Sequence, residues 1–178
     1  MEWKVLDSTY VLYHRWMKVR RDTCLLPNGE VIDDYFWVES PDNTLVVALT
    51  PAAEVLLVRQ YKPAAQRVLI EFPGGVVDPG EDPLAGAQRE LREETGFGGG
   101  EWQSLGTFWA DPSKKSAQSH LFLAQGVTLI AQPRRDATEE IQLLYRPWLE
   151  LVADSCAIQV SSSVVALTLA QRYLHHAP

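Results

Sequence analysis

Three glutamates in one short segment have the spacing of a metal site. Glu90, Glu93 and Glu94 lie at positions i, i+3 and i+4, which places their carboxylates along one edge of a helix. Like charges placed in this way repel each other, and a divalent cation would offset the repulsion. Carboxylate oxygens without cysteine or histidine select a hard ion, so the residues indicate Mg²⁺, with Mn²⁺ as the alternative. Taken alone, the same pattern is also typical of a solvated acidic helix face.

The loop before these glutamates strengthens the metal-site interpretation. Residues 71–81 are rich in glycine and proline, and such a loop lets backbone atoms approach a metal ion or a phosphate closely. A helix is predicted over residues 82–95. Asp82 can cap it, Pro83 suits its first position and Gly96 can end it. The loop would therefore lead directly into the helix that carries the glutamates.

The rest of the chain predicts a mixed sheet flanked by helices. Five strands are expected over residues 45–49, 55–61, 102–109, 120–124 and 141–145. Two further helices are expected over residues 147–152 and 161–175. Near the N-terminus, Pro27-Asn28-Gly29 is a strong turn signal between two strand-forming runs and predicts a β-hairpin. The fold class is therefore α/β (α+β), with a mixed sheet and an N-terminal β-hairpin extension.

The composition is that of an acidic globular protein. The 178 residues suit one domain, which we place over residues 1–178, and 46% of them are hydrophobic. The net charge of −7 argues against a nucleic-acid or membrane partner, and no apolar run approaches the ~20 residues of a membrane span. Cys24 and Cys156 lack metal-ligand spacing, which favours a reducing, cytoplasmic setting and no zinc site.

The loop and the helix together match a complete family motif. Residues 75–97 fit Gly-x5-Glu-x7-Arg-Glu-U-x-Glu-Glu-x-Gly-U, where U is a bulky apolar residue, and in this the chain resembles the Nudix hydrolases. The resemblance implies an α/β/α sandwich that hydrolyses a nucleoside diphosphate linked to another group. It also implies roles for individual residues. Glu90 and Glu94 resemble the main metal ligands, Glu93 contributes directly or through water, the Gly74 carbonyl resembles the usual backbone ligand, Arg89 orients the carboxylates, and Glu81 caps and stiffens the loop.

Residues outside the motif resemble the ADP-ribose and nucleoside-diphosphate-sugar pyrophosphatase branch of that family. The similarity lies in residues 58–63, in residues 69–75 and in Pro112. It implies a nucleoside diphosphate sugar as substrate, with Glu71 and Pro112 among the substrate-binding residues. Arg59 and Lys62 could hold the diphosphate or the terminal sugar, since an arginine fork suits phosphate, or they could form an ordinary charge pair at the end of a strand. Residues 111–115 read Asp-Pro-Ser-Lys-Lys where this branch is expected to carry Ser-Pro-Gly. Strict ADP-ribose hydrolysis and GDP-mannose-type hydrolysis therefore stand as alternatives within the enzyme class.

Aromatic residues in the N-terminal region have two interpretations. Tyr35 and Trp37 could stack on a nucleobase, since a base presents a π-face, or they could pack within the hairpin. The similar branch uses this region, residues 1–45 here, to form a dimer, and the resemblance therefore implies a homodimer.

A catalytic base is also expected. In the similar branch it often comes from a late acidic loop, which here points to Glu139 or Glu140, with a solvated turn as the alternative. Outside the enzymes, a non-catalytic nucleotide-sugar sensor is possible on the same fold. The intact set of glutamates argues against the sensor, because a binding module has no need of a full metal cluster.

Overall fold

Two compact units make up the chain. The computed structural model describes residues 1–134 and 140–176. Unit 1 comprises residues 1–42 and 109–118, and unit 2 comprises residues 43–108 and the chain from residue 119 onward. Most of the predicted extension over residues 1–45 thus lies in unit 1, together with a segment from the middle of the chain that the sequence did not associate with it.

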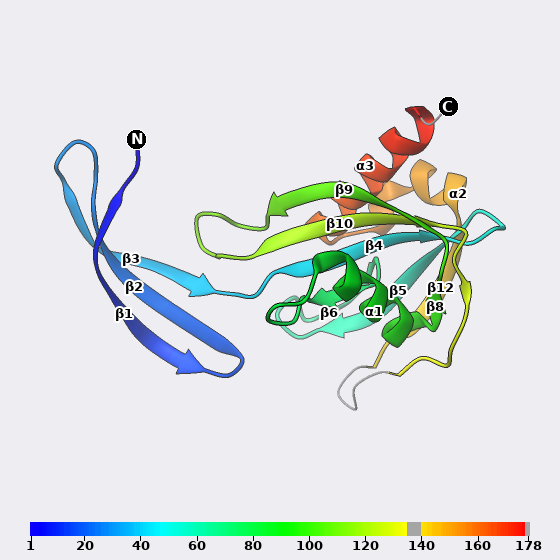
Figure 1. Cartoon of the computed structure of the whole chain (residues 1–178), viewed down its shortest axis with the longest axis horizontal. Coiled ribbons are helices and arrows are strands. Elements are labelled where there is room, and N and C mark those ends of the chain that lie inside the picture. The colour runs from blue at the N-terminus through cyan, green and yellow to red at the C-terminus, as the bar shows by residue number, and fades with distance from the viewer. Residues whose placement is uncertain (135–139, 177–178) are drawn as a thin grey trace. The chain divides into compact units, whose positions relative to one another are not determined.

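Unit 1 is built on a three-stranded antiparallel sheet in the order β1-β2-β3 (Figure 1). Its strands are β1 (Lys4–His14), β2 (Met17–Leu25) and β3 (Val31–Glu39). The turn between β2 and β3 confirms the predicted hairpin, with Gly29 at a φ of 89° that other residues rarely adopt. The predicted hairpin supplies two of the three strands, and the sequence analysis did not distinguish β1 as the third. Every residue of β1 is exposed, so the strand lacks the alternation of buried and exposed positions by which strands are recognised.

Unit 2 contains a mixed sheet in the order β12-β5-β4-β10-β9, with β6 paired to β5 and β7 paired to β4. Its strands are β4 (Asn43–Leu49), β5 (Glu54–Lys62), β6 (Arg67–Glu71), β7 (Gly74–Val76), β9 (Glu101–Trp109), β10 (Gln118–Gln125) and β12 (Gln142–Pro147). β10 runs parallel to β4, whereas β5 and β7 run antiparallel to it. A separate two-stranded sheet joins β8 (Phe97–Gly98) to β11 (Thr128–Leu129). The parallel and antiparallel pairs confirm the predicted mixed sheet.

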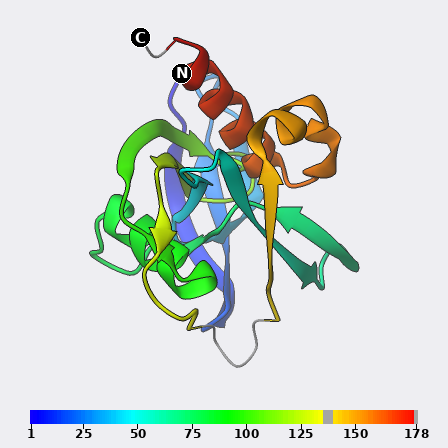
Figure 2. The ribbon, with the colours of Figure 1, turned by 90° about the vertical axis from the view of Figure 1, so that its right-hand side faces the viewer.

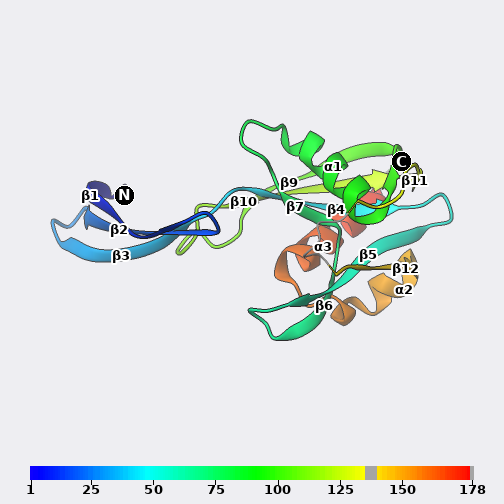
Figure 3. The ribbon, with the colours of Figure 1, turned by 90° about the horizontal axis from the view of Figure 1, so that it is seen from below.

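Both faces of this sheet are covered, as Figure 3 shows, by α1 (Pro83–Thr95) and by α3 (Ser161–His176). Side chains of a strand alternate between its faces, so Val46 and Ala48 pack with Leu91 of α1, while Leu45 and Val47 belong to the cluster on the α3 side. The short helix α2 (Trp148–Ala153) lies beside α3 (Figure 2) and is followed by the 3₁₀ helix Ser155–Ala157. In the parts of the chain that the structure describes, no helix is long and apolar enough to cross a membrane.

Local signals fix the ends of α1 where the sequence placed them. The Asp82 side chain accepts hydrogen bonds from the backbone N–H groups of Leu84 and Ala85, at 3.0 and 3.1 Å. Gly96 ends the helix in the left-handed region, at a φ of 80°, and donates its N–H to the Arg92 carbonyl. The preceding loop contains strand β7, which the sequence did not predict because its glycines are poor strand formers. This strand fixes the loop against β4.

Candidate active site

Two glycines bring the backbone of β7 close to its neighbours. A Cβ atom added to Gly75 would lie 2.5 Å from the carboxylate of Glu90, and one added to Gly74 would lie 2.0 Å from the carbonyl oxygen of Thr44. Both distances are shorter than any real Cβ contact. At Gly74 the neighbour is backbone, so only glycine fits there, whereas at Gly75 a side chain would displace the carboxylate of Glu90.

Arg89 clamps the loop to the helix. Its Nε and Nη2 atoms donate to the two carboxylate oxygens of Glu81, both at 2.9 Å, and Nη2 also donates to the Val76 carbonyl at 2.9 Å. Glu81 accepts a further hydrogen bond from the backbone N–H of Asp78 at 3.0 Å. These bonds, from Arg89 first and then from Asp78, lower the pKa of Glu81 to about 2, and the Glu81 carboxylate in turn raises the pKa of Arg89. Glu81 therefore bonds both to the loop backbone and, through Arg89, to α1.

The same guanidinium contacts two of the three candidate metal ligands. Nη1 of Arg89 donates to Glu90 at 2.8 Å and to Glu93 at 3.2 Å. A planar guanidinium with donors in fixed directions restricts the rotamers of the carboxylates that it binds. Arg89 thus joins the loop to the acidic edge of α1.

The three glutamates differ in burial, which helical spacing alone did not reveal. Glu94 is only 5% exposed, and its Oε2 accepts a hydrogen bond from the Gly74 N–H at 2.9 Å. The side chains of Glu90 and Glu93 are 16% and 38% exposed. On the same edge of the helix, Glu94 is therefore buried and bonded to the loop backbone, whereas Glu93 is open to solvent.

The donor set fits a hard divalent cation in its chemistry. It consists of carboxylates next to a glycine backbone that leaves no room for side chains, and Mg²⁺ prefers oxygen ligands of this kind. Within residues 1–134 and 140–176, no group of three or more histidine, cysteine, aspartate or glutamate side chains is arranged to hold a metal ion. In this structure Arg89 bonds to Glu90 and Glu93, so these two carboxylates share one guanidinium.

Three of the predicted substrate-binding residues lie on neighbouring strands of unit 2. Lys62 pairs with Glu71 at 2.6 Å, and Gln60 donates to the same carboxylate at 2.8 Å. Arg59 lines a pocket of about 650 Å³ that also contains Glu140. The structure thus brings Arg59 to one of the two candidate bases, while Lys62 and Glu71 form an ion pair. Glu139 lies outside the described residues.

The other three predicted substrate-binding residues meet in unit 1. Tyr35, Trp37 and Pro112 line a pocket of about 280 Å³. Its remaining wall is formed by Trp109, Lys115 and Ser116. We expected Trp109 only as the end of a strand, and no motif marks it. Its place in the pocket arises because residues 109–118 belong to the same unit as the hairpin.

A buried carboxylate orients one wall of this pocket, and the sequence analysis missed it. Asp22 is 6% exposed and accepts a hydrogen bond from the indole N–H of Trp37 at 2.7 Å. The Arg20 guanidinium pairs with Asp22 at 3.6 Å and lies 4.9 Å from the centre of the Trp37 ring. The only signal for Asp22 in the sequence was the alternation of Lys18, Arg20 and Asp22 along β2. This strand lies between the aromatic residues of β1 and β3.

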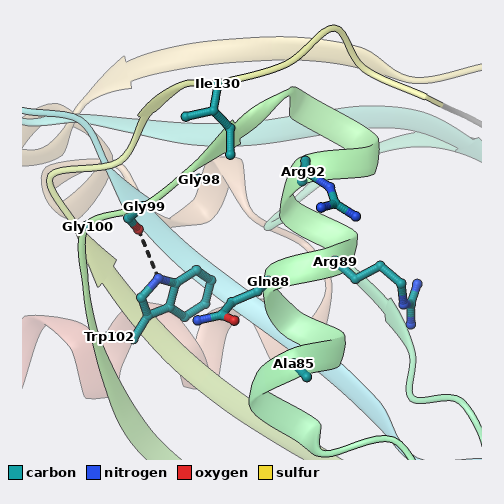
Figure 4. Close-up of a pocket in the computed structure, with 9 residues that line it drawn as sticks. All are labelled: Ala85, Gln88, Arg89, Arg92, Gly98, Gly99, Gly100, Trp102 and Ile130. Carbon is teal, nitrogen blue, oxygen red and sulfur yellow. Dashed lines mark hydrogen bonds between the residues drawn. The ribbon is translucent and has the colours of Figure 1, made fainter.

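A further pocket of about 420 Å³ adjoins α1 without including the glutamates. Gln88, Trp102 and the glycines at 98–100 are among its walls, and the Trp102 indole donates to the Gly99 carbonyl at 2.9 Å. Figure 4 shows the Arg89 side chain directed away from Trp102. Arg89 and Arg92 of α1 also line this cavity, so it adjoins the helix that carries the glutamates.

Comparisons with known proteins agree with this geometry. The sequence matches the NUDIX domain over residues 39–155 and the nucleoside diphosphate sugar hydrolase N-terminal domain over residues 3–38. Over 127 residues it is 31% identical to a methanol dehydrogenase activator of Bacillus methanolicus, covering 71% of this chain and 68% of that protein. Over 120 residues it is 29% identical to an ADP-ribose pyrophosphatase of Bacillus subtilis, covering 67% and 64%.

Two further similarities extend the comparison. An ADP-sugar pyrophosphatase of Mus musculus is 37% identical over 120 residues, which cover 60% of this chain and 54% of that enzyme. The matched segments thus span between about half and about two thirds of these three relatives. The crystal structure of an ADP compounds hydrolase has the same fold, with a TM-score of 0.85, 24% identity, and coverage of 98% of this chain and 95% of that one.

Proposed function

The chain belongs to the Nudix family of hydrolases, and we propose that it hydrolyses the pyrophosphate of a nucleoside diphosphate sugar with Mg²⁺, to a nucleoside monophosphate and a sugar phosphate. The observation that carries this proposal is the set of glutamates on α1 that Arg89 and the Gly74 backbone hold in place. The match of residues 3–38 to the nucleoside diphosphate sugar hydrolase N-terminal domain supports the substrate class, as do the relatives named for ADP-ribose and ADP-sugars.

We assign Mg²⁺ to Glu90, Glu93, Glu94 and the carbonyl of Gly74, with Mn²⁺ as the alternative ion. Such an ion supplies charge neutralisation of the diphosphate and lowers the pKa of a bound water. The protein contributes the positions of the ligands. Arg89 orients Glu90 and Glu93, and the N–H of Gly74 fixes Glu94. Arg89 also donates hydrogen bonds to Glu81 and to the Val76 carbonyl. The same side chain therefore links the loop to the carboxylates.

We assign the proton transfer from the attacking water to Glu139 or Glu140. Glu140 shares a pocket with Arg59, so a carboxylate and a guanidinium face the same space. A guanidinium suits the paired oxygens of a diphosphate. Lys62 is bonded to Glu71, and we therefore assign the first phosphate contact to Arg59. We assign to Lys62 and Glu71 the role of stabilising the two paired strands that carry them.

We assign the nucleobase to the pocket formed by Tyr35, Trp37 and Pro112. Three aromatic side chains and a proline line it, with Lys115 as the one charged side chain among its described walls. Stacking on an aromatic ring stabilises a base without selecting its identity strongly. The hydrogen bond from Trp37 to Asp22 keeps the indole in one orientation, which lowers the entropic cost of binding a flat ring.

We further propose a homodimer formed through residues 1–45. Exposed apolar side chains of a single sheet are concentrated there: Trp3, Val5, Leu6, Tyr10, Val11, Leu12, Tyr13, Trp16, Met17, Val31 and Phe36. Contiguous apolar patches of this kind mark association surfaces. The free thiols of Cys24 and Cys156 support a reducing, cytoplasmic location.

The test is a panel of sugar nucleotides with the products identified by mass. ADP-ribose, ADP-glucose, UDP-glucose and GDP-mannose are each incubated with Mg²⁺ and, as a control, with a chelator. We expect a nucleoside monophosphate and a sugar phosphate in the presence of the ion. Turnover of ADP-ribose alone, or of GDP-mannose alone, would decide between the two narrower specificities. Tight binding of a sugar nucleotide without turnover would favour the sensor and overturn the enzymatic proposal.

A further inference from the structure

Three buried side-chain oxygens in the described part of the chain lack a hydrogen-bond partner. They are Oδ1 of Asn43, Oγ1 of Thr44 and Oγ of Ser119. All three lie at the beginning of β4 or β10, two strands that pair with each other. Burying a polar group without a partner is unfavourable, so each such atom in a native structure calls for an explanation.

Thr44 points to the face of the sheet that α1 covers. Val46 and Ala48, two and four residues further along β4, pack in the cluster that contains Leu91 of α1. Because side chains alternate with a period of two, Thr44 shares this face. It is 1% exposed, so bulk solvent does not reach its hydroxyl.

The register of β4 and β7 places Thr44 beside the carboxylate of Glu90. Thr44 stands directly opposite Gly75 in the antiparallel pair. Opposed residues of such a pair project to the same face, with Cβ positions about 4.5–5.5 Å apart. The Cβ position of Gly75 lies 2.5 Å from the Glu90 carboxylate. Glu90 therefore occupies the space above Gly75, on the side to which the hydroxyl of Thr44 projects.

We propose that Thr44 is a positioning residue of the metal site, whose hydroxyl gains its missing hydrogen bond from the hydration shell of Mg²⁺ bound at Glu90. This proposal rests on the Mg²⁺ site assigned above. Mg²⁺ dehydrates reluctantly and keeps several waters when proteins bind it. A buried hydroxyl next to the ligand Glu90 would orient one of these waters, and the ion would at the same time satisfy an oxygen that the metal-free protein leaves unpaired.

Ser119 provides a matched control within the same strand pair. Its hydroxyl is also buried and unpaired. However, it lies two residues before Leu121, which packs in the cluster on the α3 side of the sheet, so it faces away from α1 and Glu90. Removal of either hydroxyl should raise the Tm of the metal-free protein. Only removal of the Thr44 hydroxyl should weaken Mg²⁺ binding.

The experiment compares Thr44→Val, Thr44→Ser and Ser119→Ala with the wild type. Tm is measured in the presence of a chelator, and the Mg²⁺ dissociation constant is measured by calorimetry without substrate. Valine has the shape of threonine but lacks the hydroxyl, so Thr44→Val should raise the metal-free Tm by about 2–4 °C, the shift expected from one unpaired buried group in a chain of this size. The same variant should weaken Mg²⁺ binding by roughly tenfold.

Thr44→Ser keeps a hydroxyl and should bind Mg²⁺ within about twofold of the wild type. Ser119→Ala should raise the metal-free Tm and leave Mg²⁺ binding unchanged. Wild-type Mg²⁺ affinity in Thr44→Val, a fall in its metal-free Tm, or an equal loss of affinity in Ser119→Ala would each overturn the proposal. Because these measurements need no substrate, Mg²⁺ binding that depends on Thr44 without hydrolysis of any sugar nucleotide would refute the proposed function alone.

Discussion

The two units of this chain are stabilised in different ways. In unit 2 each face of the sheet carries a cluster of fully buried side chains, one toward α1 and one toward α3. In unit 1 the buried residues among those described are Asp22, Cys24 and Ala117, and β1 is exposed along its whole length. Unit 2 therefore has a core of its own, whereas unit 1 leaves most of its apolar side chains exposed.

Two arginines show the same contrast at the level of single side chains. Arg89 in unit 2 binds three carboxylates and a carbonyl, an arrangement that fixes charged groups for chemistry. Arg20 in unit 1 lies over the rings of Tyr10 and Trp37, an arrangement that restricts the positions of aromatic side chains. We therefore expect substitutions in unit 2 to act mainly on kcat and those in unit 1 to act on association and KM.

The largest effect is expected from Glu94→Gln in unit 2. The amide oxygen of glutamine can still accept the Gly74 N–H, but the charge that would bind the metal is lost. We expect kcat to fall by at least about a hundredfold, with Tm close to that of the wild type. Glu101→Gln, an exposed glutamate of β9, is the control and should keep wild-type turnover. Near-normal turnover of Glu94→Gln at saturating Mg²⁺ would remove Glu94 from the metal site.

The double variant Glu139→Gln/Glu140→Gln tests whether the base also belongs to unit 2. A base acts in the transition state, so its loss should lower kcat by about a hundredfold while the dissociation constant of the substrate changes only a few-fold. Single-turnover kinetics measures the first quantity and calorimetry the second. Glu150→Gln on α2 serves as the control. If the double variant hydrolyses substrate at the wild-type rate, the base lies elsewhere, and Glu93 becomes the next candidate.

Leu12→Asp tests whether the exposed face of β1 is covered by a second copy. Leu12 is 45% exposed, and a buried charge without a partner opposes association. Light scattering should give twice 20.0 kDa for the wild type and 20.0 kDa for the variant, with a higher KM if the dimer shapes the base pocket. Leu149→Asp, at an exposed leucine of unit 2, should remain dimeric. A wild-type mass of 20.0 kDa at micromolar concentration would refute the dimer.

The smallest effect concerns the pH dependence of the clamp. The folded-state pKa of Glu81 is about 2, below its ordinary value of 4.5. The stability that Glu81 contributes is therefore complete above about pH 4.5 and is lost as the pH falls toward 2. Glu81→Gln should lower Tm by a few degrees at neutral pH, and the gap to the wild type should narrow below pH 4.5. A gap that stays constant down to pH 3 would show that the carboxylate charge is not what stabilises the loop.

The sequence by itself determined the features that depend on neighbouring residues. The ends of α1 follow from Asp82, Pro83 and Gly96, because capping hydrogen bonds and left-handed backbone are local. The turn at Gly29 follows for the same reason. The motif over residues 75–97 identified the candidate chemistry, since its spacing encodes one loop and one helix face.

Tertiary structure alone decided which of these side chains are buried and what they contact. The N–H of Gly74 reaches the buried carboxylate of Glu94, and Thr44 lies opposite Gly75, because β4 pairs with β7 in one particular register. Trp109 joins Tyr35 although 74 positions separate them in the sequence. Strand register and long-range packing arise from the sum of many weak contacts, and no short segment of the sequence contains that sum.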